Sequence, residues 1–144
     1  MKNDENEPKE YFERNIILVT ALLATGLFLD WLSLYLLMQV NPWGTAFAVP
    51  GLALTIQGIW LVTNPYAIIY DDRFEIKQNF IYNKEFYYLD AKRVESKHAG
   101  KLQVVYNDEE KEKLPLFGMR ASYKEKFRQA LSEKIAKSVV NRDF

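Results

Sequence analysis

The chain has 144 residues, of which 49% are hydrophobic and 26% charged, with 19 basic and 19 acidic side chains. The charges are unevenly distributed, because residues 16–65 contain only one, Asp30. A block of that length with one charge cannot cover a small soluble protein, so the composition excludes an ordinary soluble domain and indicates a membrane anchor with a water-soluble remainder.

The residue inventory also restricts the chemistry. The absence of cysteine excludes a disulfide scaffold and thiolate chemistry, and one histidine, His98, leaves little for a histidine metal site. Residues 66–144 hold 16 basic and 13 acidic groups, an excess too small for strong nucleic-acid binding. We expect no enzyme activity, no cofactor, no bound metal and no nucleic-acid partner.

Two apolar runs follow a polar tail at residues 1–15. The runs cover residues 16–40 and 43–62 and are separated at Asn41-Pro42. Each can cross a hydrocarbon core of about 30 Å at about 1.5 Å per helical residue, which predicts a transmembrane helical hairpin over 16–62. A signal peptide would need a basic start and a shorter apolar core, and a soluble hairpin would need a polar face.

Basic residues near the ends of the spans predict the orientation. Lys9 and Arg14 precede the first span, Arg73, Lys77 and Lys84 follow the second, and the turn has none. Because basic residues are retained in the cytoplasm, both termini should be cytoplasmic. We expect a multi-pass protein of the cytoplasmic (inner) membrane, with the lipid bilayer as its first partner.

Beyond Pro65 the apolar period changes to two, which predicts strands. The pattern is clearest where Leu102, Val104 and Tyr106 alternate with their neighbours. Turn signals separate the segments, and 92–97 reads as an exposed edge strand. Strands are predicted over 66–70, 73–77, 85–89, 92–97, 102–106 and 113–117.

A C-terminal amphipathic helix follows the strands. Ser122 and Glu125 have the spacing of a capping box. Its apolar stripe is most simply a lid packed on strand residues such as Val104, although an interfacial or partner-binding helix has the same pattern. This arrangement predicts a domain over 66–137 and a C-terminal tail over 138–144. The stripe consists of Tyr123, Phe127, Ala130, Leu131 and Ile135.

Two transmembrane helices followed by strands and a closing helix resemble the bacterial pleckstrin-homology-like (bPH) membrane proteins. Residues 64–77 and 82–90 carry the resemblance, because they match that family's exit from the membrane, first hairpin, and strand ending in a polar turn. The resemblance implies a small mostly-β PH-like barrel or sandwich closed by the helix. It supplies no catalytic residues. Relatives that bind phosphoinositides use a basic first loop, whereas this loop contains Asp71 and Asp72.

Asp30 is the sharpest feature of the spans, because a carboxylate at a helix centre costs about 2.5–3.5 kcal/mol on insertion scales. Small and polar residues share its face and a face of the second span. Antiparallel helices would bring Asp30 near the depth of Thr55. Asp30 can have a role in helix packing, within one chain or between chains, or in an ion path. Alternatively it is only tolerated, because its carboxyl is protonated or is hydrogen-bonded by Thr55 or Gln57. The two stripes contain Gly26, Asp30, Ser33, Gly51, Thr55 and Gly58.

The densest basic run comprises Lys92, Arg93, Lys97, His98 and Lys101. A solvated strand and turn is the simpler interpretation, because acidic residues interrupt the run. An anionic membrane surface or an acidic partner is the alternative binding role.

Two functions fit this organisation. The first is a non-enzymatic membrane anchor that presents a cytoplasmic PH-like domain to a protein partner or membrane assembly. The alternative is a ligand-gated membrane effector with oligomerising hairpins. An effector requires a pocket of several hundred Å³ with converging polar groups, whereas a binding module requires a filled core and an exposed edge or groove.

Overall fold

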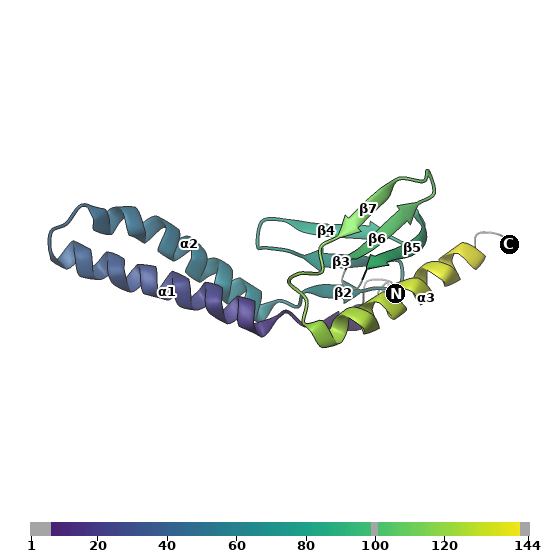
Figure 1. The fold of residues 1–144 in the computed structure, drawn as a ribbon, viewed down its shortest axis with the longest axis horizontal. Helices are drawn as coiled ribbons and strands as arrows, with labels where there is room; N and C mark the ends of the chain where they lie inside the picture. The colour runs from purple at the N-terminus through teal and green to yellow at the C-terminus, as the bar shows by residue number, and fades with distance from the viewer. Residues whose placement is uncertain (1–6, 99–100, 142–144) are drawn as a thin grey trace, which may run out of the picture. The chain divides into compact units, whose positions relative to one another are not determined.

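The computed structural model describes residues 7–98 and 101–141, which form two compact units. The helical unit consists of residues 15–64 and 79–81, and the β unit contains the other described segments. The predicted order of two apolar helices, a strand region and a C-terminal helix is confirmed (Figure 1).

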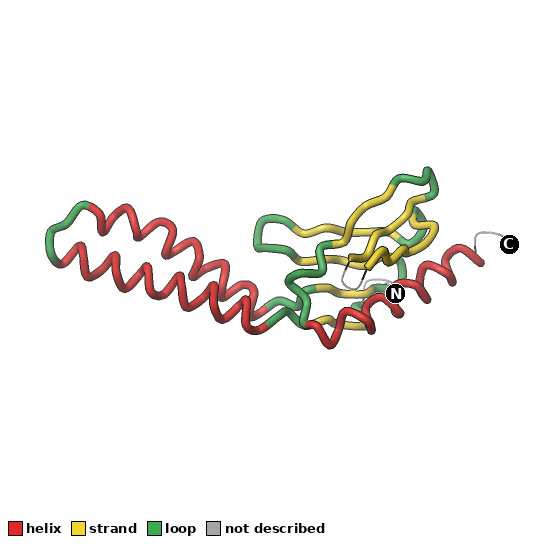
Figure 2. Tube along the Cα trace, in the orientation of Figure 1, coloured by secondary structure: helices red, strands yellow, loops and turns green. Residues whose placement is uncertain are grey.

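The helical unit is a hairpin of α1 (Ile16–Met38) and α2 (Trp43–Thr63) (Figure 2). Asn15 begins α1, because its side chain accepts a hydrogen bond from the Ile17 amide at 3.1 Å. Val40 has a φ of 56°, a left-handed conformation that ends a helix, so α1 stops before the predicted residue 40. Pro42 is the N-cap of α2, and the side chain of the preceding Asn41 accepts a hydrogen bond from the Trp43 amide at 3.0 Å.

Both helices are long and apolar enough to cross a membrane. Only 17% and 11% of their apolar windows are buried within the structure, whereas the core helix of a soluble protein is mostly buried. Large side chains such as Trp31, Leu52 and Ile59 are instead more than half exposed. This distribution suits helices with apolar surroundings.

The described residues of the β unit form two antiparallel sheets. The first sheet has the order β1-β2-β3-β4 and the second the order β5-β6-β7, and these strands do not close into one barrel. The strands are β1 (Glu10–Phe12), β2 (Ala67–Ile69), β3 (Arg73–Lys77), β4 (Asn83–Tyr87), β5 (Ala91–His98), β6 (Lys101–Tyr106) and β7 (Lys111–Leu114).

The strand β1 comes from the segment ahead of α1 and α2. It pairs with β2, with Glu10 opposite Ile69 and Phe12 opposite Ala67. Phe12 is completely buried. The expected tail over 1–15 and domain over 66–137 therefore omitted one strand of the sheet, because three residues are too few for a period of two to be recognised. The helical hairpin is inserted between two neighbouring strands.

The core of the β unit is closed by α3 (Ala121–Val140). Phe127 and Leu131 are completely buried, in the same cluster as Val104. The Phe127 ring meets Phe12 edge-on at a centroid distance of 4.9 Å and Phe74 at 6.0 Å. Ile135 is also buried, and Tyr123 and Ala130 pack against the cluster. The stripe thus faces the core.

Both ends of α3 differ from the predictions. The capping box is wrong, because Arg120 is the N-cap and makes no side-chain capping bond. Ser122 lies within the first turn, and the Glu125 carboxylate accepts from Arg128 and Gln129 instead of reaching back. The helix continues to Val140, so the first residues of the tail expected at 138–144 are helical.

Candidate functional site

The two apolar helices α1 and α2 meet along a seam of small and polar residues. Near its middle, the Thr55 hydroxyl donates a hydrogen bond to the Asp30 carboxylate, with Oγ1 and Oδ2 2.7 Å apart. Nearer the turn, the Ser33 hydroxyl donates to the Gly44 carbonyl at 2.7 Å. We call this contact the helical seam; it comprises Gly26, Asp30, Ser33, Gly44, Gly51, Thr55 and Gly58.

Glycines bring the backbones of the seam close together. A Cβ added to Gly26 would lie 2.6 Å from the backbone nitrogen of Thr55, and one added to Gly51 would lie 2.9 Å from that of Asp30. Both distances are below van der Waals contact, so larger residues would force the helices apart. The seam therefore partners Asp30 inside the hairpin, where an unpaired polar group would be costly.

A second cluster lies in the β unit, at the residues that directly precede and follow the helical hairpin. The Arg14 guanidinium donates to the Lys77 carbonyl and lies 5.4 Å from the centre of the Tyr66 ring. Burial lowers the pKa of Arg14 to about 10, which leaves it charged at neutral pH. Glu13 is joined to Arg120 by an ion pair of 3.1 Å. These residues (Glu13, Arg14, Tyr66, Lys77 and Arg120) form what we call the clasp.

The clasp was not anticipated as a site. From the sequence, Arg14 is a topology signal, and Tyr66 is a strand residue and an interfacial aromatic at the exit of the second span. A basic residue followed by an apolar span gives no indication of a partner 63 residues away. The contacts of the clasp hold together the two segments of the β unit that precede and follow the helical hairpin, residues 13–14 and Tyr66.

The basic run is compensated by carboxylates of neighbouring segments. Lys92 pairs with Glu109, and Arg93 lies 2.8 Å from Glu95. Lys111 pairs with Glu95 at 2.9 Å and holds the pKa of that carboxyl below its usual value, with Arg93 as the second cause. Lys101 is exposed. The side chains of Lys97 and His98 lie outside the described residues.

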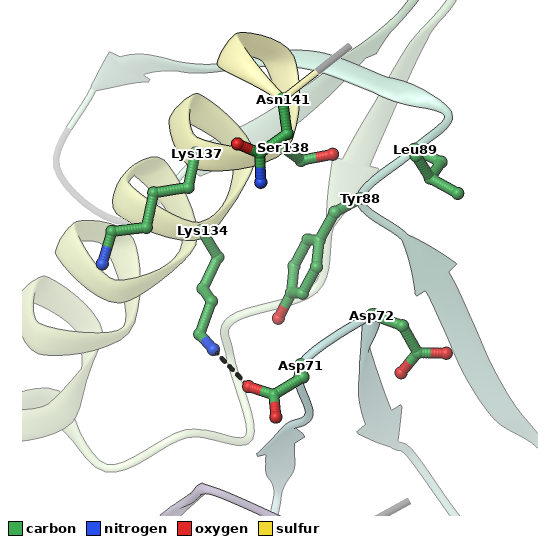
Figure 3. Close-up of a pocket in the computed structure, with 8 residues that line it drawn as sticks. All are labelled: Asp71, Asp72, Tyr88, Leu89, Lys134, Lys137, Ser138 and Asn141. Carbon is green, nitrogen blue, oxygen red and sulfur yellow. Dashed lines mark hydrogen bonds and ion pairs between the residues drawn. The ribbon is translucent and has the colours of Figure 1, made fainter. Parts of the chain in front are cut away.

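A cleft of about 330 Å³ lies beside the C-terminal half of α3 (Figure 3). Polar groups from the β2–β3 turn and from the helix point into it. Tyr88, whose pKa is raised chiefly by burial, forms one wall. We call it the α3 cleft; it is lined by Asp71, Asp72, Tyr88, Leu89, Lys134, Lys137, Ser138 and Asn141.

The charges of the α3 cleft neutralise one another. The Lys134 ammonium donates to Asp71 at 2.8 Å and lowers the pKa of that carboxyl. Asp72 pairs with Arg73 at 3.0 Å, and Lys137 pairs with Glu133 at 2.6 Å. The cleft consequently offers shape and hydrogen-bonding groups but no surplus charge with which to recruit an ion.

The described residues do not provide a metal centre, because they contain no cluster of three or more His, Asp or Glu side chains able to hold an ion. Comparison of the chain with protein-family models, with curated proteins and with solved structures gives no match. The class that the structure itself defines is an apolar helical hairpin joined to an antiparallel β unit with a C-terminal helix.

Proposed function

We propose that the chain is a non-enzymatic protein of the cytoplasmic membrane, in which a two-span hairpin anchors a PH-like binding unit in the cytoplasm. The pairing of β1 with β2 carries the proposal. Since β1 precedes the hairpin and β2 follows it, both strands must lie on one side of the membrane. The chain between them then crosses an even number of times, and α1 and α2 supply two spans of suitable length.

The distribution of basic residues supports the cytoplasmic side for both termini, because none lies in the turn between α1 and α2. Single cysteines at Asn3, Asn41 and Asn141 test this in a chain without native cysteine; Asn3 lies outside the described residues. With an impermeant maleimide and intact cells, only Asn41→Cys should be labelled. Labelling of Asn3→Cys or Asn141→Cys before permeabilisation would contradict the proposed topology.

The binding role is supported by a filled core combined with an open surface at α3. Leu89 and Val140 are 63% and 56% exposed, and Leu89 borders the α3 cleft. A photo-crosslinking amino acid at Leu89 should capture a discrete protein partner in cells, whereas the same group at Asp108 in the β6–β7 turn should not. Equal crosslinking at both positions would contradict a partner site at the cleft.

The ligand-gated effector is the second candidate, because the α3 cleft has the required size and converging polar groups. Its compensated charges favour the first proposal over this one. A nucleotide and metabolite panel separates the two. An effector would be stabilised against heat by one compound, and Lys134→Met would abolish the effect; a binding module would respond to none.

A further inference from the structure

The turn between β3 and β4 carries large apolar side chains at its surface. Phe80 is 51% exposed, Ile81 is 81% exposed and Tyr82 is 49% exposed. The Asn79 side chain accepts from the Ile81 amide at 2.9 Å, which fixes the turn as a compact Asx structure. Exposed turn positions are usually polar or glycine, so three consecutive large apolar residues indicate a surface that meets something other than water.

This turn belongs to the helical unit even though its flanking strands belong to the β unit. Residues 79–81 cluster with residues 15–64, and the Phe80 amide donates to the Gln57 side chain at 3.4 Å. Gln57 lies six residues before Thr63, the last residue of α2, which is about 9 Å along a helix axis. The turn is therefore alongside the helix at a level inside its apolar span.

We propose that residues 79–82 insert into the boundary between lipid headgroups and acyl chains, as a third point of membrane contact beside α1 and α2. The inference rests on the proposed function, because it takes α2 to be a membrane span. If the 21 residues of α2 match a hydrocarbon core of about 30 Å, a group level with Gln57 lies about 9 Å inside the edge of that core. Interfacial segments bury their apolar faces about 5–10 Å into the boundary between headgroups and acyl chains, so the turn reaches the deep side of that boundary.

The chemistry of the turn fits a lipid interface. Aromatic rings are enriched at that depth, where an apolar body and a polar group are both accommodated, and Tyr82 has this character. Ile81 supplies apolar area for the acyl side. The Gln57 amide oxygen is matched by the Phe80 amide, so the polar residue of α2 at this level has a partner when the turn is in place.

Site-directed fluorescence in lipid tests the inference on the full chain. Because the chain has no cysteine, Ile81→Cys, Ile59→Cys and Asp108→Cys can each carry one environment-sensitive nitrobenzoxadiazole label. The proteins are reconstituted in vesicles of phosphatidylcholine and phosphatidylglycerol, with and without lipids spin-labelled near the carbonyl end of the acyl chain. Phe80→Cys provides a second reporter if a label at residue 81 prevents folding.

The label at Ile81 should emit at shorter wavelength than that at Asp108 and be quenched at least about twofold more by spin-labelled lipid, as expected for a group in the interface. Quenching at Ile59 with none at Ile81 or Phe80 would overturn the inference and leave the hairpin intact. No quenching at Ile59 would overturn the proposed function itself. Blue-shifted emission at Ile81 without lipid quenching would mean that a second protein copy covers the turn, which would also overturn the inference.

Discussion

Asp30 shows how a costly residue is accommodated between two apolar helices. Its carboxylate has a hydroxyl partner in Thr55 and abuts the flat surface left by Gly51. The hydrogen bond itself is worth only about 0.6 kcal/mol on average in membrane helices. The larger effect is steric, because the missing side chain of Gly51 leaves room for the Asp30 carboxylate against the α2 backbone.

Replacement of Asp30 should separate these roles. In Asp30→Asn the side-chain oxygen can still accept from Thr55, so the thermal stability in detergent should change by less than about 1 kcal/mol. Asp30→Leu removes the acceptor and presents a branched side chain to Gly51, so its melting temperature should fall. The measurement is thermal unfolding followed by circular dichroism. Unchanged or higher stability for Asp30→Leu would show that the carboxylate is merely tolerated.

Gly51→Leu should be more damaging than an equivalent change on the outer face of α2. Its Cβ would approach the Asp30 backbone to 2.9 Å, and overpacking of this kind costs about 1–3 kcal/mol. Ala53→Leu is the matched control, because Ala53 is exposed on the same helix. Thermal unfolding in detergent compares the two. Equal melting temperatures would argue against tight packing at the seam.

At the scale of elements, α3 and β1 complete a core that the remaining strands cannot close alone. The rings of Phe12 and Phe127 meet at 4.9 Å, so the first and last described elements of the chain pack directly on each other. An ion pair between Lys134 and Asp71 adds a surface contact between α3 and the β2–β3 turn. Exposed pairs of this kind contribute little, so apolar burial must hold the helix in place.

Leu131→Asp should therefore unfold the β unit. The change removes a completely buried side chain and places an unpaired carboxylate in the core, at a cost of about 2–5 kcal/mol or more. Gln129→Asp is the control, since Gln129 is exposed on the same helix. Limited proteolysis of the membrane-bound protein reports the result. Protection of Leu131→Asp equal to that of the control would refute the packing of α3.

At the scale of the molecule, a hairpin whose two helices are long and apolar enough to cross a membrane is inserted between β1 and β2, two neighbouring strands of one sheet. The β unit obtains a strand from each side of the hairpin, and the clasp links the residues that precede and follow the hairpin. Phe12 and Ala67 are direct neighbours in the sheet. The distance between Arg14 and Pro65 can thus be spanned by a short turn as readily as by two helices.

Replacing residues 15–64 with a short Gly/Ser turn should yield a folded, water-soluble β unit. Its melting should be cooperative in heat denaturation monitored by circular dichroism, because β1, the core and α3 are all retained. The same chain without residues 1–14 should be markedly less stable, since it lacks Phe12 and the clasp. Equal stability of the two shortened chains would contradict the role assigned to β1.

The sequence by itself determined the features that depend on local pattern. The block with a single charge predicted α1 and α2 to within two residues, and the 3.6-residue period predicted the stripe of α3. The strands β2 to β7 were located, and β3 (Arg73–Lys77) has the predicted bounds. The ends of others were shifted, as for β4 (Asn83–Tyr87) against 85–89 and β7 (Lys111–Leu114) against 113–117. Such features are readable because burial of a face imposes its period on consecutive residues.

The tertiary structure alone decided what depends on residues far apart in the chain. β1 has three residues and acquires its role only from pairing with β2, and Arg14 finds the Lys77 carbonyl across 63 positions. Likewise, α3 begins at Ala121 and not at the Ser122 motif; Arg120 is its N-cap, and the Arg120 amide donates to the Glu13 carbonyl at 3.1 Å. The local sequence specifies the period of apolar residues and the propensity for helix or strand. Which strands and side chains pair depends on the apolar core that they bury together.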